Sequence, residues 1–295
     1  MTPSPPLAAI EGGGTKFLVE VGEDPDHVAA SARFETTAPA ATLDQVIAFV
    51  RPHRVQRVGL GIFGPIELRS EPRFGSILRC PKPGWSGFGV HGYLETRLGV
   101  PVTVDTDVNA AAMAEQRWGA AQGCDPVVYV TIGTGIGFGV WIHGKPLHGL
   151  LHSELGHMFV PRLEVDGVVD SFPGACPFHG GCLEGMASGS AVQIRVGTAP
   201  KELDVAHPVF DLVGRYVAHG VLAATYGLSP ERVVIGGGLG QNHRVLGAIR
   251  REVATLDAGY LSRSELNVGV TGFIVPARLS TRAGVAGAFA LALTG

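Results

Sequence analysis

The chain has few cysteines, no excess of positive charge and no long apolar run. Only four of its 295 residues are cysteine, which excludes the disulfide framework of a small secreted protein. The formal net charge of −3 offers no basic footprint for nucleic acid. No apolar stretch reaches the roughly 20 residues of a membrane-spanning helix. The first residues lack the basic and then apolar pattern of a signal peptide. These absences predict a soluble, cytoplasmic protein without a nucleic-acid or membrane partner.

The residues that are abundant indicate a globular chain of the α/β class. Hydrophobic residues make up 45% and charged residues 17%, enough for a sizeable core. Apolar patterns predict strands at 7–10, 17–21, 30–36, 58–62, 102–104, 127–132, 138–142 and 232–235. They predict helices at 42–50, 91–98, 108–121, 204–226, 245–256 and 283–293, the first opened by a capping box of Thr42 and Gln45. Alternating strands and helices favour an α/β fold.

A repeated pattern predicts two related lobes. Strand, Gly/Thr turn and strand occur at 7–21 and again at 127–142. We expect an N-terminal α/β lobe of residues 1–118, with the C-terminal helix 283–295 packed on it. Residues 119–282 would then form a C-terminal α/β lobe.

Four potential metal ligands lie close together in the second half: His157, Cys176, His179 and Cys182. The spacing in Cys176-Pro-Phe-His179-Gly-Gly-Cys182 lets neighbouring side chains surround one cation, and two thiolates with two imidazoles suit tetrahedral zinc. The alternative is that they are ordinary buried or loop residues, which two such steps in seven residues disfavour. Four protein ligands leave no open position for water, so a structural zinc is favoured over a catalytic one.

Three glycine-rich turns each follow an apolar strand directly: Gly12-Gly-Gly-Thr15, Gly133-Thr134-Gly135 and Gly236-Gly-Gly238. Such turns expose backbone N–H groups, and threonine adds hydroxyl donors, so they suit phosphate oxygens. A single turn of this kind is more often a tight hairpin than a phosphate site. Three of them, two with threonine, favour a nucleotide held between two lobes.

Asp107 lies at the expected N-terminus of a helix, within Asp105-Thr-Asp-Val-Asn109. Aspartate is a common helix cap, and that interpretation stays open. A carboxylate in this place is also suited to accept the proton of a hydroxyl that attacks a phosphate, and Asn109 could bind the same sugar. Glu154 and His157, three residues apart, would project together from a helix.

In their order, these segments resemble the ROK (repressor, open reading frame, kinase) sugar kinases of the hexokinase/actin-like superfamily. The resemblance covers nearly the whole chain and is strongest to the zinc-containing bacterial fructokinases. It is carried by Ile10 to Phe17, Phe63-Gly-Pro65, Pro81-Lys-Pro-Gly-Trp85, Asp105 to Ala111, Ile132 to Gly137, Pro146 to Leu150, Cys176 to Cys182 and Leu183 to Gly189. It implies a two-lobed actin-like/hexokinase (ribonuclease H-like) ATPase fold, with nucleotide and sugar in the cleft and a zinc-binding segment at 157–182.

The resemblance also implies a role for each candidate residue. Asp107 is the general base, and Asn109, Glu154, His157 and Glu184 contact the sugar. The ATP contacts are Gly13, Gly14, Thr15, Lys16, Thr134, Gly135, Gly236, Gly237, Gly238 and Gly240. Zinc is held by His157, Cys176, His179 and Cys182, and Glu11 helps to place Mg²⁺ through water. The implied reaction is D-fructose with ATP to D-fructose 6-phosphate and ADP, in a protein expected to be a homodimer.

The sequence departs from the family pattern at three positions. Phe138 stands where a small residue is expected after the second phosphate turn. Its ring would narrow the part of the cleft that holds the nucleotide. Ser190 replaces the usual proline after Ala-Ser-Gly, and Arg282 replaces a small polar residue before the last helix. These changes bear on nucleotide preference and sugar specificity, and leave the reaction class as it is.

Three other functions are open at this stage. A glucokinase or mannose kinase of the same family differs only in the sugar. A sugar-sensing repressor of the family would carry an added helix-turn-helix domain, whereas only Met1 to Pro6 precede the first expected strand. A zinc hydrolase would need an open metal position. The zinc segment with Leu183-Glu-Gly-Met-Ala-Ser188 favours fructose by resemblance.

Overall fold

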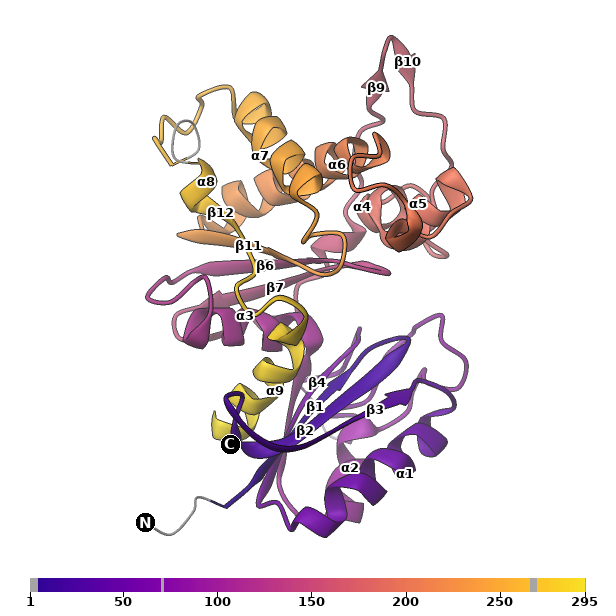
Figure 1. Ribbon diagram of the computed structural model, residues 1–295, viewed down its shortest axis with the longest axis vertical. Helices are drawn as coiled ribbons and strands as arrows, with labels where there is room; N and C mark the ends of the chain where they lie inside the picture. Colours follow the sequence, from indigo (N-terminus) through magenta and orange to yellow (C-terminus); the bar gives the residue numbers. More distant parts are fainter. Residues whose placement is uncertain (1–4, 70–71, 266–269, 295) are drawn as a thin grey trace. The chain divides into compact units, whose positions relative to one another are not determined.

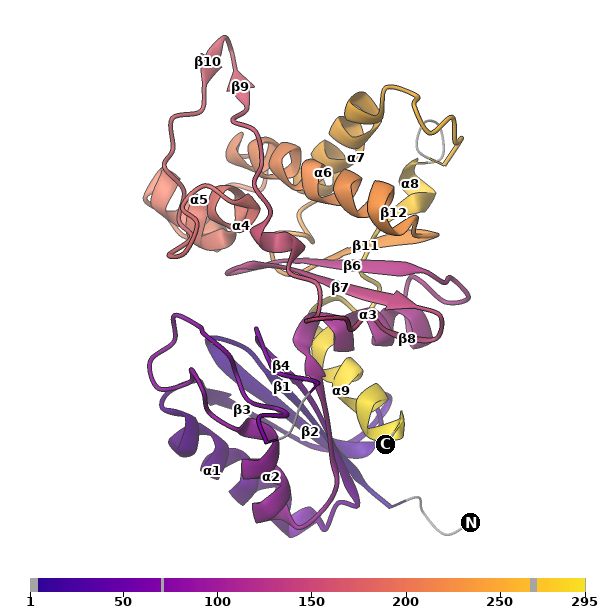
Figure 2. The same cartoon turned by 180° about the vertical axis from the view of Figure 1, so that it is seen from behind.

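The protein, described here by a computed structural model, folds into two compact units (Figures 1 and 2). The structure describes residues 5–69, 72–265 and 270–294. The first unit contains the chain up to Trp118, the segment Lys145–Ser153 and the C-terminal part from Arg282. The second contains Gly119–Gly144 and Glu154–Thr281. Lys145–Ser153, which falls within the expected C-terminal lobe of residues 119–282, therefore belongs to the first unit.

The first unit is built on a mixed five-stranded sheet in the order β3-β2-β1-β4-β5. Its strands are β1 (Leu7–Gly12), β2 (Lys16–Asp24), β3 (His27–Glu35), β4 (Arg57–Ile62) and β5 (Val102–Thr106). β1 runs antiparallel to β2 and parallel to β4, and β4 runs parallel to β5. The helices are α1 (Pro39–Val50), α2 (Val90–Leu98), α3 (Asp107–Trp118) and α9 (Ala283–Thr294), with a 3-10 turn at Arg51–His53 and another at Ser280–Arg282 on the boundary between the units.

Side chains of β1 point alternately to the two faces of this sheet, and both faces are buried. Ala8 and Ile10 join the core cluster that contains Leu43 of α1 and Leu94 of α2. The intervening Ala9 packs in a second cluster with residues of α9. A strand covered on both faces reads as a continuous apolar run, and Leu7 to Ile10 is such a run. The carboxyl ends of β1 and β5 then carry the glycine turn and Asp107.

The second unit contains a sheet in the order β12-β11-β6-β7-β8. Its strands within this unit are β6 (Val127–Ile132), β7 (Ile136–Ile142), β11 (Arg232–Gly236) and β12 (Ile274–Pro276), whereas the short edge strand β8 (Lys145–Pro146) falls in the segment Lys145–Ser153 of the first unit. The helices are α4 (Leu183–Ala187), α5 (Gly189–Val196), α6 (Val209–Leu228), α7 (His243–Asp257) and α8 (Val270–Phe273), with 3-10 turns at Leu155–His157 and Pro200–Glu202. A short hairpin, β9 (Glu164–Val165) and β10 (Val168–Val169), extends beyond α4 and α5 (Figures 1 and 2).

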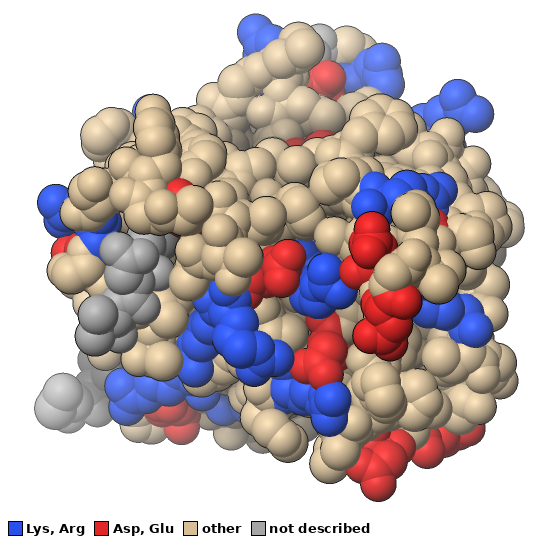
Figure 3. All heavy atoms as spheres, turned by 90° about the horizontal axis from the view of Figure 1, so that it is seen from above, with Lys and Arg blue, Asp and Glu red and all other residues tan. Residues whose placement is uncertain are grey.

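Helices α6 and α7 lie side by side over the sheet of the second unit (Figures 1 and 2). On the face drawn in Figure 3, basic and acidic side chains are interspersed. Between α6 and α7, Asp211 accepts hydrogen bonds from Arg244 and Arg251. Within the described part of the chain, none of the helices combines the length and apolarity that a membrane crossing requires.

Three expected helix boundaries were wrong. Helix α1 begins at Pro39, ahead of the expected capping box, because proline with its fixed φ suits the first turn of a helix. Thr42 is buried and accepts a hydrogen bond of 2.9 Å from the N–H of Thr37 instead of capping. Helix α3 ends at Trp118 instead of residue 121, and α6 begins at Val209 instead of residue 204. The α/β class itself is confirmed.

Candidate functional site

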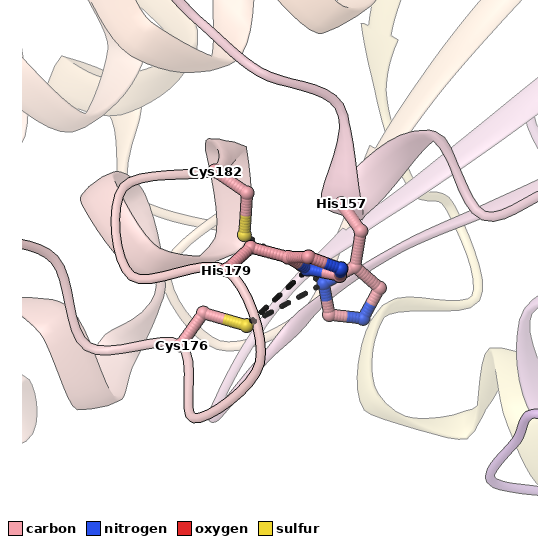
Figure 4. Close-up of side chains that lie close together, drawn as sticks. All are labelled: His157, Cys176, His179 and Cys182. Atoms are coloured by element: carbon pink, nitrogen blue, oxygen red, sulfur yellow. Dashed lines mark hydrogen bonds between the residues drawn. The ribbon is translucent and has the colours of Figure 1, made fainter. Parts of the chain in front are cut away.

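The four predicted metal ligands converge in the second unit (Figure 4). Their ligand atoms all lie within 4.8 Å of one another. His157 comes from the 3-10 turn Leu155–His157, and Cys182 directly precedes α4. Between Cys176 and Gly180 the chain forms a tight turn closed by two backbone hydrogen bonds, with Gly180 at a φ of 58°. Glycine adopts this left-handed conformation without strain, so the turn brings the ligands together.

The donor set and its spacing fit a tetrahedral zinc ion. Nδ1 of His157 lies 3.7 Å from Sγ of Cys176 and 3.6 Å from Sγ of Cys182. Nδ1 of His179 lies 3.8 Å from Sγ of Cys176. Zinc–sulfur and zinc–nitrogen bonds of about 2.3 and 2.05 Å give a sulfur–nitrogen edge of roughly 3.5 Å in a tetrahedron. Burial raises the pKa of the Cys182 thiol to about 11, so a cation bound there displaces a proton.

His157 faces two directions. Its Nδ1 points to the two cysteine sulfurs, while its Nε2 lies 4.0 Å from Oε2 of Glu154. The backbone supports this pairing, since the N–H of His157 donates to the carbonyl of Glu154 over 2.9 Å. A histidine that binds metal through one ring nitrogen commonly uses the other to orient a carboxylate. The geometry therefore joins the ligand cluster to Glu154.

Glu184 lies against the second glycine turn, between β6 and β7. Its Oε2 accepts a hydrogen bond of 3.1 Å from the N–H of Ile136. A Cβ atom added at Gly135 would lie only 2.5 Å from the same oxygen, so a larger residue there would displace the carboxylate of Glu184. The residue expected to contact the sugar thus also contacts the turn expected to hold ATP.

The third glycine turn, after β11, lies beside the second. The carbonyl of Ile132, the last residue of β6, accepts hydrogen bonds from the N–H groups of Leu239 and Gly240 over 2.9 and 3.3 Å. Gly237 within this turn has a φ of 80°, which few residues other than glycine adopt. Because Ile132 leads directly into Gly133, the two turns share one edge of the sheet. Gly236, Gly237, Gly238 and Gly240 are therefore brought next to Thr134 and Gly135.

Asp107 lies close enough to Glu11 in the first unit to affect the pKa of Glu11. Asp107 is the first residue of α3 and partly buried; burial raises its pKa to about 6, although the N–H of Val108 donates to its carboxylate over 2.9 Å. Burial, and then repulsion by Asp107, raise the pKa of Glu11 to about 7, with Lys16 working in the opposite direction. Oε2 of Glu11 is buried and has no hydrogen-bond partner among the described residues. Such an orphaned carboxylate oxygen fits an approaching cation.

The first glycine turn, which links β1 to β2, lies in the same unit. The N–H of Gly13 donates to the carbonyl of Lys16 over 2.9 Å, and the hydroxyl of Thr36 donates to the carbonyl of Gly13 over 2.7 Å. Gly14 and Thr15 at its tip are exposed. The structure thus places Gly13, Gly14, Thr15 and Lys16 at the end of the strand that carries Glu11.

Sequence reasoning missed a buried network next to Asp107. Asp105, at the end of β5, accepts a hydrogen bond of 2.9 Å from the side-chain amide of Asn109. Its other oxygen lies 2.9 Å from Nε2 of His148, and this pairing raises the pKa of His148. Asn109 is almost completely buried. Asp105 and His148 both fall in segments that carry the family resemblance, but nothing in the sequence indicates that they meet.

Two of the departures from the family pattern are explained by packing. Phe138 is 1% exposed, and its ring lies against Gly220 of α6. The ring therefore fills the core and does not narrow the space expected for the nucleotide. Arg282 donates to Glu20 and to the carbonyl of Pro25, each over 2.9 Å. It therefore anchors the start of α9 on the edge of the first unit.

Comparison with known proteins identifies relatives over the whole chain. The model of the ROK family matches residues 7–294. A fructokinase from Zymomonas mobilis is 40% identical over 293 residues, covering 96% of this chain and 95% of the relative. A fructokinase from Pediococcus pentosaceus is 37% identical over 287 residues and covers 97% of each chain.

Solved structures of ROK proteins have the same fold as this chain. A ROK family glucokinase from Streptomyces griseus, in complex with glucose and AMPPNP, has a TM-score of 0.78 at 26% identity, covering 98% of this chain and all of that one. A ROK hexokinase from Thermus thermophilus has a TM-score of 0.73 at 26% identity, covering 98% of both chains. These matches confirm the actin-like/hexokinase fold. The chain belongs to the ROK family.

Proposed function

We propose that this protein is a fructokinase that transfers the γ-phosphoryl group of ATP to D-fructose. The observation that carries the proposal is the placement of Asp107, a partly buried carboxylate at the start of α3. Its pKa of about 6 leaves it ionised at neutral pH yet basic enough to accept a proton. Fructose as acceptor is supported by the fructokinases from Zymomonas mobilis and Pediococcus pentosaceus.

In the proposed reaction Asp107 takes the proton of a sugar hydroxyl. The hydroxyl oxygen attacks the γ-phosphorus, the bond from that phosphorus to the bridging oxygen breaks, and ADP leaves as fructose 6-phosphate forms. Asn109, Glu154, His157 and Glu184 are proposed to hold the sugar. The amide of Asn109 donates to Asp105 over 2.9 Å, and Oε2 of Glu154 lies 4.0 Å from Nε2 of His157. Side chains fixed in this way hold a substrate with little loss of entropy on binding.

ATP is proposed to be held by the three glycine turns. The proposed contacts are Gly13, Gly14, Thr15, Lys16, Thr134, Gly135, Gly236, Gly237, Gly238 and Gly240. Mg²⁺ accompanying ATP would neutralise phosphate charge, and Glu11 is proposed to hold it through water. The buried, unpartnered Oε2 of Glu11 supports that assignment.

Zinc is proposed at His157, Cys176, His179 and Cys182, where it would fix the loop that precedes α4 and the 3-10 turn that carries Glu154. The measured sulfur–nitrogen separations support this assignment. A closed set of four protein ligands gives the zinc a structural role. A homodimer acting in the cytoplasm completes the proposal. The two cluster cysteines and Cys80 and Cys124 are all free thiols, as a reducing compartment favours.

A panel of hexoses assayed with ATP and Mg²⁺ tests the proposal. We expect kcat/KM to be highest for D-fructose, with ADP formed in equal amount to fructose 6-phosphate. A preference for glucose would support the second candidate, a glucokinase, which the glucose complex of the Streptomyces griseus relative favours. If none of the hexoses is phosphorylated, the kinase assignment is wrong.

A further inference from the structure

The segment that follows the ligand cluster holds the second glycine turn by its carbonyl groups. The N–H of Gly189, the first residue of α5, donates to the carbonyl of Gly133 over 2.7 Å. Ser190 contributes twice, since both its N–H and its hydroxyl donate to the carbonyl of Thr134, over 3.3 and 2.9 Å. Two successive carbonyls of one turn are thus held by the first turn of one helix.

These bonds determine where the N–H groups of the turn point. In a trans peptide the carbonyl and the following N–H point in opposite directions. Because the carbonyls of Gly133 and Thr134 face α5, the N–H groups of Thr134 and Gly135 face away from it. Thr134 itself is exposed. Two adjacent N–H groups directed outward from an exposed turn can donate together to an anion.

Glu184 holds the same turn on its far side. Its carboxylate accepts from the N–H of Ile136, the residue that follows Gly135. Glu184 is the first and Ser190 the last residue of the segment 184–190. This one segment therefore makes hydrogen bonds to both ends of the turn, at Ile136 and at Thr134. That segment starts two residues after Cys182, and Cys182 itself accepts a hydrogen bond of 3.5 Å from the N–H of Gly185.

We propose that Ser190 is a positioning residue for nucleotide phosphates: by holding the carbonyl of Thr134 with two donors, it directs the N–H groups of Thr134 and Gly135 toward the phosphate oxygens. The proposal rests on the proposed function for the identity of the ligand, a nucleoside di- or triphosphate. The ligand cluster then supports the nucleotide turn as well as Glu154, because one continuous segment links Cys182 to Ser190.

Substitutions at Ser190 separate its two donors. Ser190→Ala removes the hydroxyl and keeps the N–H, whereas Ser190→Pro removes both. Proline is tolerated in the first turn of a helix, where the N–H makes no intrahelical bond, so the second variant should fold. Ser190→Thr keeps both donors. Ile194→Ala, at an exposed side chain on the same helix, is the matched control.

Calorimetric titration of each purified full-length variant with ADP tests the proposal without any need for turnover. We expect Kd for ADP to rise about 3- to 5-fold in Ser190→Ala and about 10-fold or more in Ser190→Pro, as one and then two hydrogen bonds are lost. Ser190→Thr should restore wild-type affinity, and Ile194→Ala should not change it. In steady-state assays KM for ATP should rise in parallel, while KM for fructose stays within about twofold.

The outcomes are distinct. Equal ADP affinity in wild type, Ser190→Ala and Ser190→Pro overturns the assignment of Ser190, and so does an equal rise in KM for both substrates. If the wild-type chain binds ADP but phosphorylates no sugar, the fructokinase proposal fails, and the titrations still decide the role of Ser190. If the wild-type chain does not bind ADP, both proposals are wrong.

Discussion

Nε2 of His148 lies 2.9 Å from Oδ2 of Asp105, a carboxylate whose side chain is only 3% exposed. The pair connects the segment Lys145–Ser153 to the end of β5, two residues before Asp107. The hydrogen bond from His148 to Asp105 raises the pKa of His148 above its usual value near 6.5, although burial and Lys145 work against it. Within the first unit, the segment Lys145–Ser153 is therefore held to β5 by a titratable contact.

We predict that His148→Gln destabilises the protein more at low than at high pH. The folded protein binds the His148 proton more tightly than the unfolded chain, so the stabilisation is complete below the unfolded pKa of about 6.5. It is lost as pH rises through the higher pKa of the folded state. Urea unfolding of wild type and variant should show a free-energy difference at about pH 5.5 that shrinks by about pH 9. A difference independent of pH would contradict this role.

Asp170 is predicted to be a main source of stability in the second unit. It accepts hydrogen bonds from Arg195 over 2.7 and 3.0 Å and from the hydroxyl of Tyr216 over 2.7 Å. Burial acts to raise its pKa, but the donors outweigh burial and lower it to about 2. Asp170→Ala leaves Arg195, whose side chain is 15% exposed, without its partner, which costs about 3 kcal/mol in unfolding free energy.

Urea unfolding at neutral pH measures that loss, and Glu265→Ala serves as the control because its pair with Arg263 is exposed and should contribute little. The stabilisation by Asp170 is complete above its unfolded pKa of 3.8 and is lost as pH falls toward about 2. The wild type should therefore lose its advantage over Asp170→Ala in that acidic range. Similar unfolding midpoints for Asp170→Ala and Glu265→Ala would show that the network is dispensable.

Removal of metal should weaken both stability and fructose binding. Cys182→Ser takes one ligand from the cluster, whereas Cys124→Ser changes a thiol outside it. We expect the first variant to lose zinc, measured by elemental analysis, and to lower Tm by about 5 °C or more, at about 2–4 °C per kcal/mol. Cys124→Ser should keep the zinc content and the Tm of the wild type. Fructose affinity should fall with zinc because His157 links the cluster to Glu154; unchanged stability and affinity after chelation would refute this coupling.

Two glycines of one turn should respond differently to alanine. A Cβ at Gly135 would displace the carboxylate of Glu184 and break its hydrogen bond to Ile136, whereas a Cβ at Gly133 has no neighbour within 4 Å. We expect Gly135→Ala to lower the free energy of unfolding by about 1 kcal/mol, the worth of one such bond. Gly133→Ala should change it less. Equal losses in denaturant titrations would mean that Glu184 is not held there.

Features that depend on neighbouring residues were predictable from the sequence. The strands around the glycine turns follow from apolar runs, and three of the four ligands, Cys176, His179 and Cys182, follow from Cys and His spacing within one short loop. The predicted start of α1 was wrong because Pro39, three residues before the capping pattern of Thr42 and Gln45, already suits the first turn of a helix.

Features that depend on distant residues were not predictable. His148 and Asp105 meet only because Lys145–Ser153 packs with the first unit, which no local pattern encodes. The core position of Phe138 depends on the absence of a side chain at Gly220 in a helix far along the chain. The bonds from Ser190 to Thr134 likewise require α5 to lie against the turn. Such contacts arise from tertiary packing, so a single sequence leaves them undetermined.

The most direct measurement of the central claim is kcat for fructose phosphorylation by Asp107→Asn. Asparagine keeps the shape and the bond from the N–H of Val108 but cannot accept the proton, so folding and ADP affinity should stay as in wild type. We predict that kcat falls by about 10²- to 10⁴-fold, the contribution of a positioned general base. Turnover within a few-fold of wild type, with fructose and ATP saturating, would contradict the assignment of Asp107 as the catalytic base.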